Sequence, residues 1–317
     1  MAISICMFLP SKKTYNDLLK ETTARGVIPL DAELILCFVS GWDSRAAYAA
    51  HATEPVRWTL LQWLRFWHAH AQCKRRVPVA YITGKKEFYG TKFLVSKQTL
   101  CPRPETEHLV DAARESLANA TGRILLIDVG TGSGCIPIAL LNESVSAPGA
   151  KGAQIHAFAT DISRRALRVA QKNAVVHKTP IMFLRGNLLV PFLRLVQQKN
   201  QTHLLQSALV CITANLPYLT EEQYRSEPSI GKEPKRALVA GNGGLALYEK
   251  LIVHVTQLVV LLKPNTPVHL FLEIDPSQTE RIQNLLRAEF PNAEITVQKD
   301  LAGHDRVVCA ALSAPPS

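Results

Sequence analysis

Apolar runs alternate with amphipathic helical segments along residues 123–312 of this 317-residue chain. The apolar runs predict strands at 124–129, 155–160, 181–184, 208–214, 268–274, 294–298 and 307–312. Helical periodicity occupies 135–141, 164–177, 245–262 and 278–290. Such alternation predicts an α/β fold with a doubly wound, mainly parallel, seven-stranded sheet covered on both faces. The last two strands are joined only by a short connection through Gly303, so we expect an antiparallel edge hairpin there.

The first 76 residues have a different character and predict a small helical domain. All four tryptophans of the chain lie there, among leucines and alanines at helical spacing: Trp42, Trp58, Trp63 and Trp67. We expect these rings to form the core, although one or two of them on a partner-binding surface is the alternative. Asp31 is the expected N-cap of a helix over 32–39, which Gly41 would end.

Residues 77–106 predict a β-hairpin linker between this helical domain and a larger domain at 107–317. The arms of the hairpin are expected at 81–84 and 87–90, on either side of a basic turn at Lys85 and Lys86. The sequence CPRPETE follows, and its two prolines predict an extended entry into a helix over 108–118. Thr106 is the expected cap of that helix.

Composition narrows the class of protein without identifying its chemistry. The chain is 47% hydrophobic and 20% charged, as in soluble globular proteins, and no apolar run is long enough for a membrane helix. The net charge of +10 suits either an RNA-rich partner or an ordinary basic surface. The seven cysteines are scattered without a CxxC, which predicts reduced thiols in a cytoplasm and no metal site. Residues 1–10 lack a basic leader, so we expect no secretory signal.

A glycine loop, DVGTGSG at 128–134, ends the first strand of the large domain and opens a helix. Its GxGxG spacing and preceding acid favour S-adenosylmethionine over a dinucleotide, for which GxGxxG is expected. Asp161 ends the second strand, where a carboxylate can accept hydrogen bonds from both ribose hydroxyls or cap the next helix. Asn187 ends the third strand and can either contact the adenine amine or lie in a solvated turn.

The tetrapeptide Asn215-Leu216-Pro217-Tyr218 follows the fourth buried strand. Open α/β sheets bind ligands at the carboxyl ends of their strands. An amide oxygen and a backbone carbonyl at this place can accept both hydrogens of a planar NH₂ group, and an aromatic ring can cover its flat face. The tetrapeptide therefore predicts methyl transfer to a planar nitrogen, a chemistry that a dehydrogenase does not need.

With these motifs the chain resembles the release factor glutamine methyltransferases, the HemK/PrmC family, over nearly its whole length. The shared segments are 78–84, 87–88, 102–107, the glycine loop, 215–218, 233–234, 237–238, 243–245, 248, 300, 303 and 305–307. The resemblance implies a class I S-adenosylmethionine-dependent methyltransferase. The implied acceptor is N5 of the glutamine in the Gly-Gly-Gln loop of peptide release factors.

The resemblance also implies roles for individual residues. The cofactor residues would be Asp128, Gly130, Thr131, Gly132, Ser133, Gly134, Asp161, Asn187, Leu188 and Asn215. The catalytic and glutamine-binding residues would be Asn215, Leu216, Pro217 and Tyr218, with Phe88, Arg103 and Glu107 in the pocket or between the domains. The helical domain would contact the release factor, and we expect a monomer with no membrane contact and no direct nucleic-acid substrate.

The chain departs from the family pattern at three places. Leu216 replaces the usual proline, but the backbone carbonyl performs the function, so activity is expected to survive. Asn187 stands where an acid is common, and 273–276 replaces a glycine-containing turn, which is expected to matter little to chemistry. Two alternatives share the motifs: an adenine or guanine N-methyltransferase acting on rRNA or DNA, and a non-enzymatic module that binds an adenosyl ligand.

Overall fold

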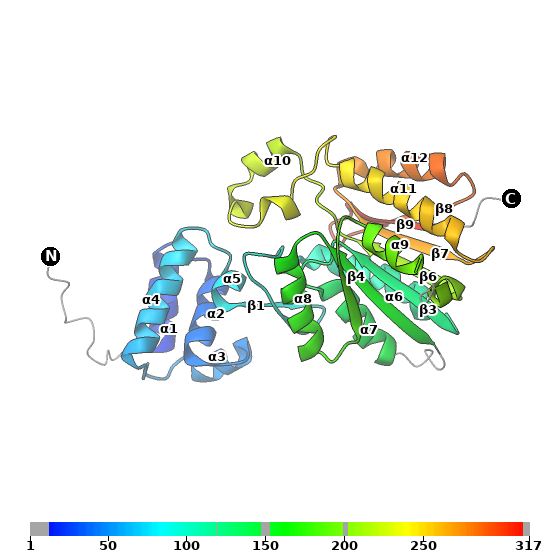
Figure 1. Cartoon of the computed structure of the whole chain (residues 1–317). Coiled ribbons are helices and arrows are strands. Elements are labelled where there is room, and N and C mark those ends of the chain that lie inside the picture. Colours follow the sequence, from blue (N-terminus) through cyan, green and yellow to red (C-terminus); the bar gives the residue numbers. More distant parts are fainter. Residues whose placement is uncertain (1–12, 119, 147–152, 199–201, 313–317) are drawn as a thin grey trace. The chain divides into compact units, whose positions relative to one another are not determined.

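The computed structural model describes residues 13–118, 120–146, 153–198 and 202–312. The expectation about a secretory signal at residues 1–10 therefore lies outside the described part. The chain forms two compact units, residues 1–85 and 86–317 (Figure 1). In the described residues no helix is both long and apolar enough to cross a membrane.

The first unit is helical, as predicted. Its helices are α1 (Tyr15–Ala24), α2 (Pro29–Ser40), α3 (Arg45–His51), α4 (Leu60–Lys74) and α5 (Val79–Thr83). Phe66 is fully buried at the centre of their apolar core, and the four tryptophan rings pack around the same core while staying partly exposed. The tryptophans are thus core residues, because helices this short are stabilised mainly by the apolar faces they bury.

Two local predictions in the first part of the chain were wrong. Helix α2 begins at Pro29, so Asp31 lies inside its first turn and Ile28 is the N-cap residue; proline suits a first helical position because its φ is already helical. Gly41 does end the helix, in the left-handed conformation at φ 76°. The segment 81–84, predicted as a strand, belongs to helix α5 and its terminal glycine.

The hairpin exists, but its turn lies further along the chain than predicted. Its strands are β1 (Lys85–Phe88) and β2 (Thr91–Leu94). Tyr89 and Gly90 form the turn with φ of 50° and 66°. A two-residue turn whose twist matches the strands needs positive φ at both positions, which the Tyr-Gly pair supplies here and the two lysines do not.

The second unit contains the predicted seven-stranded sheet, in the order β5-β4-β3-β6-β7-β9-β8. The strands are β3 (Arg123–Val129), β4 (Gln154–Asp161), β5 (Ile181–Arg185), β6 (Leu209–Ala214), β7 (Val268–Glu273), β8 (Glu294–Lys299) and β9 (Asp305–Leu312). Strands β3 to β7 pair in parallel, whereas β9 pairs antiparallel with both β7 and β8. The final hairpin is therefore antiparallel as predicted, but only β8 lies at the edge.

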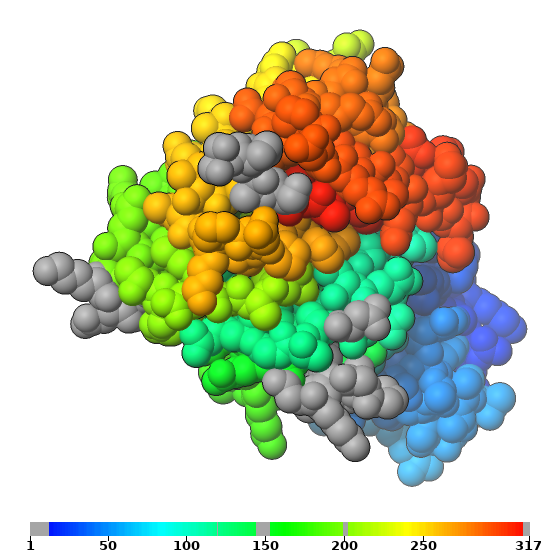
Figure 2. Space-filling view, turned by 90° about the vertical axis from the view of Figure 1, so that its right-hand side faces the viewer, coloured from blue at the N-terminus to red at the C-terminus, as the bar shows by residue number. Residues whose placement is uncertain are grey.

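Helices cover both faces of this sheet (Figure 1). One face is covered by α6 (Glu107–Ala118), α7 (Cys135–Ser146) and α8 (Arg164–Val176), and the other by α9 (Val190–Val196), α11 (Ala246–Leu261) and α12 (Thr279–Glu289). Strand β3 shows why: Ile124 and Leu126 join one apolar layer, and Leu125 and Ile127 join the other. In Figure 2 the orange-to-red segment of α12, β8 and β9 lies beside the yellow-to-orange segment of α11 and β7.

The connection from β6 to α11 is long and carries three of the remaining short elements. It contains helix α10 (Glu221–Ser226) and the 3₁₀ turns η4 (Pro228–Ile230) and η5 (Lys235–Ala237). Further 3₁₀ turns are η2 (Pro104–Thr106), η3 (Thr202–Gln206) and η6 (Pro276–Gln278). Because β6 ends at Ala214, this connection begins at the carboxyl end of the sheet, where ligands bind.

Candidate active site

A cavity of about 570 Å³ lies within the second unit. The segments that follow β3, β4, β5 and β6 line it together: 130–133, 161–163, 186–188 and 215–217. The other walls come from 97–103 and from 234–247. Its size is in the range that small-molecule ligands occupy, and its position is the one that an open α/β sheet offers a nucleoside cofactor.

The glycine loop is fixed to strand β4 by its own backbone. The N–H groups of Gly130 and Thr131 both donate to the carbonyl of Thr160, each at 2.9 Å. The N–H of Gly132 donates to Asp161 Oδ2, also at 2.9 Å. All three glycines of the loop, Gly134 included, have positive φ, which a residue with a side chain rarely adopts.

The first and last glycines of the loop serve packing at close range. A Cβ on Gly130 would lie 2.8 Å from Leu216 Cδ2, and a Cβ on Gly134 would lie 3.1 Å from Ala170 Cβ in α8. Gly130 lines the cavity but Gly134 does not. Gly134 lets α8 approach the start of α7, and its contact with the cofactor remains a prediction.

Asp161 lies on the cavity wall with both carboxylate oxygens engaged by backbone N–H groups. Besides Gly132, the N–H of Ser163 donates to its Oδ1 at 2.7 Å. Burial raises the pKa of Asp161, and the two N–H groups act in the opposite direction. The alternative reading of Asp161 as a helix cap was wrong, because Ser163 Oγ caps α8 through the N–H of Ala166. Asn187 and Leu188 line the same wall, Asn187 exposed and Leu188 buried.

Asp128 lies beneath the loop and not in the cavity wall. It is fully buried, and the hydroxyl of Thr213 donates to its Oδ1 at 2.7 Å. Burial raises the pKa of Asp128 to about 6, and the hydroxyls of Thr131 and Thr213 act in the opposite direction. Asp128 is not among the residues that line the cavity, and that it faces the methionine amino group remains a prediction.

The Asn215 side chain is held in one orientation at the end of β6. Its Nδ2 donates to Glu273 Oε2 at 2.7 Å and to Thr106 Oγ1 at 3.0 Å. No described residue donates to its Oδ1, and Asn215 lines the cavity. The amide therefore offers its acceptor atom to a ligand. Thr106, expected to cap α6, lies in the turn η2 and accepts this bond instead.

Leu216 is buried, and Tyr248 in helix α11 holds its backbone. Its N–H donates to the hydroxyl of Tyr248 in α11 at 3.3 Å, and that hydroxyl donates to the backbone carbonyl of Glu273. Tyr248 thus ties the end of β6 to the end of β7. Leu216 and Pro217 both line the cavity, as predicted for the substrate-binding tetrapeptide.

Tyr218 follows them but is not among the residues that line the cavity. Its hydroxyl donates to Glu273 Oε1 at 3.5 Å, and its backbone carbonyl accepts from Gln278 Nε2 at 2.9 Å. Burial and the neighbouring Glu273 carboxylate raise the pKa of Tyr218, so the phenol stays neutral. That its ring covers a substrate amide remains a prediction.

Of the three further residues predicted for the pocket or the space between the domains, only Arg103 lines the cavity. Arg103 lines the cavity and pairs with Glu233, which also accepts the N–H of Cys101 at 3.2 Å. Phe88 is 1% exposed and packs in the apolar core under the sheet. Glu107 Oε1 accepts the N–H of Tyr89 at 2.8 Å and so holds the hairpin turn. Phe88 and Glu107 are not among the residues that line the cavity, and the alternative that they lie between the domains remains a prediction.

Two residues with no role predicted from the sequence hold the site together, and one of them, Glu273, lies in the segment 273–276 that was expected to matter little to chemistry. Glu273, at the end of β7, is fully buried and engages Asn215 and Tyr218. A charged residue closing an otherwise apolar strand was the available signal. Asn173 in α8 is fully buried too, and its Nδ2 donates to the carbonyls of Leu94 and Ser133 at 3.0 and 2.8 Å. It fastens β2 to the glycine loop.

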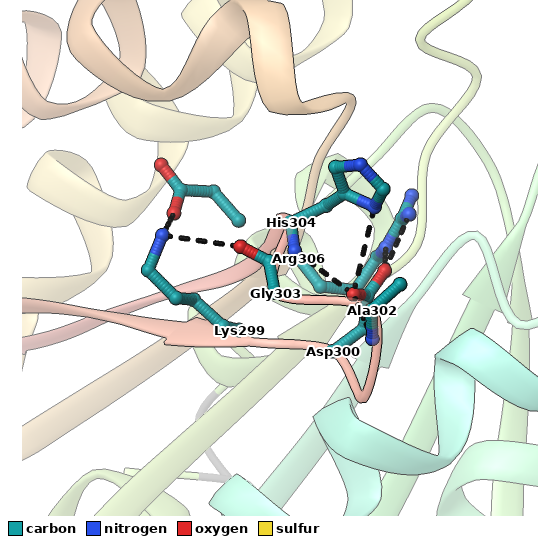
Figure 3. A network of polar contacts seen from close by, with 7 residues as sticks. Lys299, Asp300, Ala302, Gly303, His304 and Arg306 are labelled. Carbon is teal, nitrogen blue, oxygen red and sulfur yellow. Dashed lines mark hydrogen bonds and ion pairs between the residues drawn. The ribbon is translucent and has the colours of Figure 1, made fainter.

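A tight turn between β8 and β9 fixes Arg306, whose charge acts on Glu273. Asp300 Oδ2 accepts from Arg306 Nε and Nη2 at 3.3 and 2.8 Å, and its Oδ1 accepts the N–H groups of Ala302 and His304 (Figure 3). These hydrogen bonds lower the pKa of Asp300 to about 2, and the bond from Arg306 has the largest effect. The Arg306 charge in turn favours the ionised form of Glu273.

The cysteines offer no second centre in the part of the chain that is described. None of the six described cysteines forms a disulfide, and burial raises the pKa of Cys135 beside the cavity to about 12. Across those same residues, no group of three or more His, Cys, Asp or Glu side chains could hold a metal ion.

Comparison with known proteins gives relatives along most of the chain. The model of the PrmC N-terminal domain matches residues 17–84. The release factor glutamine methyltransferase of Bacillus subtilis (strain 168) is 34% identical over 285 residues, covering 88% of this chain and 90% of that protein. The protein of the same name from Enterococcus faecalis (strain ATCC 700802 / V583) is 34% identical over 285 residues, covering 84% and 93%.

Solved structures show the same fold at low sequence identity. The hMettl16 catalytic domain in complex with MAT2A 3′UTR hairpin 6 superposes with a TM-score of 0.50 at 15% identity, covering 82% of this chain and 84% of that chain. The same domain with hairpin 1 gives a TM-score of 0.50 at 14% identity, covering 89% and 94%. At this identity the likeness concerns the architecture of the sheet and its helices alone.

Proposed function

Because the chain belongs to the release factor glutamine methyltransferase family, we propose that it methylates a peptide release factor. The methyl donor is S-adenosylmethionine, and the acceptor is the side-chain amide nitrogen, N5, of the glutamine in the Gly-Gly-Gln loop. The chain is thus an enzyme of protein modification. The observation that carries the proposal is the orientation of Asn215, whose amide oxygen remains available at a cavity that suits a nucleoside cofactor.

The cavity residues fit the proposed cofactor. The backbone at Gly130 and Gly132 leaves room for close approach of a ligand, and the Asp161 carboxylate on the wall suits ribose hydroxyls. Asn187 and Leu188 would contact the adenine, and Thr131 and Ser133 would complete the loop. When bound, S-adenosylmethionine supplies an activated methyl group on its sulfonium. Here the protein has only to hold and orient it.

The glutamine amide would lie between Asn215 and Leu216. Asn215 Oδ1 and the Leu216 carbonyl would each accept one of its two N–H bonds, which directs the nitrogen lone pair toward the methyl group. Support for this role comes from the fixed amide of Asn215 and from Tyr248, which holds the backbone of Leu216. Pro217 would close the wall beside the amide, and Tyr218 would cover its flat face.

In the proposed reaction a carbon–nitrogen bond forms as the methyl–sulfur bond breaks. S-adenosylhomocysteine leaves with the electron pair of the broken bond, and the amide nitrogen then loses one proton to solvent. A carboxamide nitrogen is a poor nucleophile because its lone pair is delocalised. Alignment of the two reactants in a water-poor cavity can contribute roughly 7–11 kcal/mol to lowering such a barrier.

The helical unit is the proposed contact for the release factor. The match of residues 17–84 to the PrmC N-terminal domain supports a specialised role for this unit. We expect the protein to act as a monomer, and its scattered cysteines without a CxxC suit the reducing cytoplasm. Size-exclusion chromatography with light scattering tests the monomer.

Methyl transfer to a purified release factor tests the proposal directly. We expect the mass of the release factor to increase by a single methylation when it is incubated with the full chain and S-adenosylmethionine. A release factor whose loop glutamine is replaced by alanine is the matched control and should not change. Methylation that persists in this control would exclude the glutamine as the acceptor.

A nucleic-acid substrate is the alternative, and the net charge of +10 is the observation that favours it. The same assay therefore includes rRNA and duplex DNA with tritiated S-adenosylmethionine. We expect no transfer to either, because the named relatives act on release factors and the basic charge is also typical of an ordinary surface. Transfer to nucleic acid without transfer to the release factor would replace the proposal.

A further inference from the structure

We propose that Glu273 is a positioning residue for methyl transfer: it accepts a hydrogen bond from Asn215 Nδ2 and so keeps Asn215 Oδ1 directed at the substrate. The inference rests on the proposed function for its catalytic consequence. Its structural part, the orientation of one amide by one carboxylate, stands on the contacts alone.

The contact discriminates between the two orientations of the Asn215 amide. Glu273 Oε2 lies 2.7 Å from Asn215 Nδ2. If the amide rotated by half a turn, its oxygen would face the carboxylate oxygen, and two acceptors would repel each other. The Thr106 hydroxyl, 3.0 Å from Nδ2, gives its proton to the Glu273 carboxylate and so can only accept from Asn215, which supports the same orientation and again relies on that carboxylate. Selection therefore depends on the carboxylate.

The surroundings of Glu273 act on its pKa in opposite directions. It is fully buried, and burial raises its pKa to about 7. Hydrogen bonds from Thr106 and Tyr218 and the charge of Arg306 in β9 act in the opposite direction. Among the other titratable groups, the charge of Glu105 in η2 raises the pKa of Glu273. The charge of Glu273 in turn raises the pKa of Tyr248 in α11 and of Cys135 in α7.

Protonation would remove the selection and then reverse it. A protonated Glu273 carries an O–H, which can donate to Asn215 Oδ1 and favour the rotated amide. The Asn215 NH₂ group would then face the NH₂ group of the substrate glutamine, and neither could accept. We therefore expect the rate of methyl transfer to rise with pH through the range around 7, where Glu273 ionises.

Single-turnover methylation of the release factor between pH 5.5 and 9 tests the catalytic consequence. Glu273→Ala should lower the rate at pH 8 on the order of 10-fold or more, with the affinity for S-adenosylmethionine almost unchanged. Glu273→Gln keeps the shape of the side chain and can still accept from Nδ2. It should recover part of the rate and lose the rise around pH 7. Glu294→Gln, an exposed position on β8, is the matched control and should behave as the wild type.

A wild-type rate in Glu273→Ala would overturn the inference, as would an unchanged pH profile in Glu273→Gln. Should Glu273→Ala not fold, the isosteric Glu273→Gln variant decides alone. In that case, the inference stands only if the rate of methyl transfer by Glu273→Gln no longer rises around pH 7.

NMR of the Asn215 side-chain amide tests the orientation without any substrate. Its two proton resonances should shift with pH around 7 in the wild type and not in Glu273→Gln. If these resonances titrate but no release factor is methylated, the proposed function fails and the positioning stands. If the release factor is methylated but the resonances do not titrate, the inference fails and the proposed function stands.

Discussion

The side chain of Leu216 lies directly against Gly130, so that a Cβ at position 130 would be 2.8 Å from Leu216 Cδ2. The second residue of the tetrapeptide thus does more than offer its backbone. Its side chain is 3% exposed and fills the space between the glycine loop and the end of β6. The two motifs that the sequence presents 80 residues apart, at 130–134 and 215–218, are one packed unit.

Asn215→Ala should lower the single-turnover rate on the order of 10²-fold or more, because it removes an acceptor aimed at the reacting nitrogen. The affinity for S-adenosylmethionine, measured by calorimetry, should change little. The exposed Asn292→Ala serves as the control. An unchanged rate in Asn215→Ala would show that this amide does not orient the substrate.

Leu216→Pro should remain active within a few-fold, since the backbone carbonyl at this position is kept. The substitution removes the N–H bond of 3.3 Å to Tyr248 and part of the apolar side chain beside Gly130, but not the carbonyl. Leu216→Ala should instead lower the free energy of unfolding by roughly 2–5 kcal/mol, because a buried leucine is truncated beside Gly130. Urea denaturation measures the second effect. A Leu216→Pro variant that binds S-adenosylmethionine but transfers no methyl group would contradict the backbone role.

Gly244→Ala should impair methyl transfer although Gly244 does not line the cavity. A Cβ there would lie 1.9 Å from the backbone oxygen of Tyr218, and φ at this glycine is +85°. The tetrapeptide must shift, and a displacement of about 1 Å can reduce turnover on the order of 10²-fold. In Gly231→Ala the added Cβ meets only an ordinary contact of 3.5 Å, and the rate should stay at that of the wild type. Equal rates in the two variants would refute this prediction.

Glu273→Gln should change how stability depends on pH. Burial raises the pKa of Glu273 from 4.5 to about 7, so the folded protein binds this proton more tightly than the unfolded chain. The resulting stabilisation is fully present below pH 4.5 and is lost as pH rises through about 7. The loss is on the order of 3 kcal/mol. Burial raises the pKa of Asp128 to about 6, which adds a loss of the same sign in both proteins.

The measurement is urea denaturation at pH 5 and pH 8. The wild type should lose more stability between the two values than Glu273→Gln, which has no proton to release at this position. The same loss in both proteins would mean that Glu273 does not titrate in the folded state.

The strands and most helices could be predicted because their signals are local. Strand β3 begins one residue before its predicted start and ends where predicted, because each buried strand is an apolar run closed by polar or glycine residues. The hairpin turn was misplaced because two lysines resemble a turn as much as Tyr89-Gly90 does in sequence. Backbone conformation, with positive φ at both Tyr89 and Gly90, decided between them.

The ends of the strands could be assigned to the site because parallel strands bring their carboxyl ends to one edge. That geometry predicted a place for Gly130, Asp161 and Asn215 without knowledge of any contact, and all three line the cavity. The family resemblance implied roles at the site for Asp128, Phe88 and Glu107. These residues are not among those that line the cavity, because their side chains are held by Thr213, the apolar core and the hairpin turn.

The sequence by itself determined the order of the elements, the parallel sheet and the motifs that follow its strands, since periodicity and spacing are properties of the chain. Only the tertiary structure decided which side chains meet. Glu273 is 58 positions from Asn215 along the chain and 2.7 Å from it in space. Asn173 is 79 positions from Leu94 and bonds to both polar groups of its backbone. Such contacts arise when neighbouring strands and helices pack, so no local pattern encodes the orientation that Glu273 gives to the amide of Asn215.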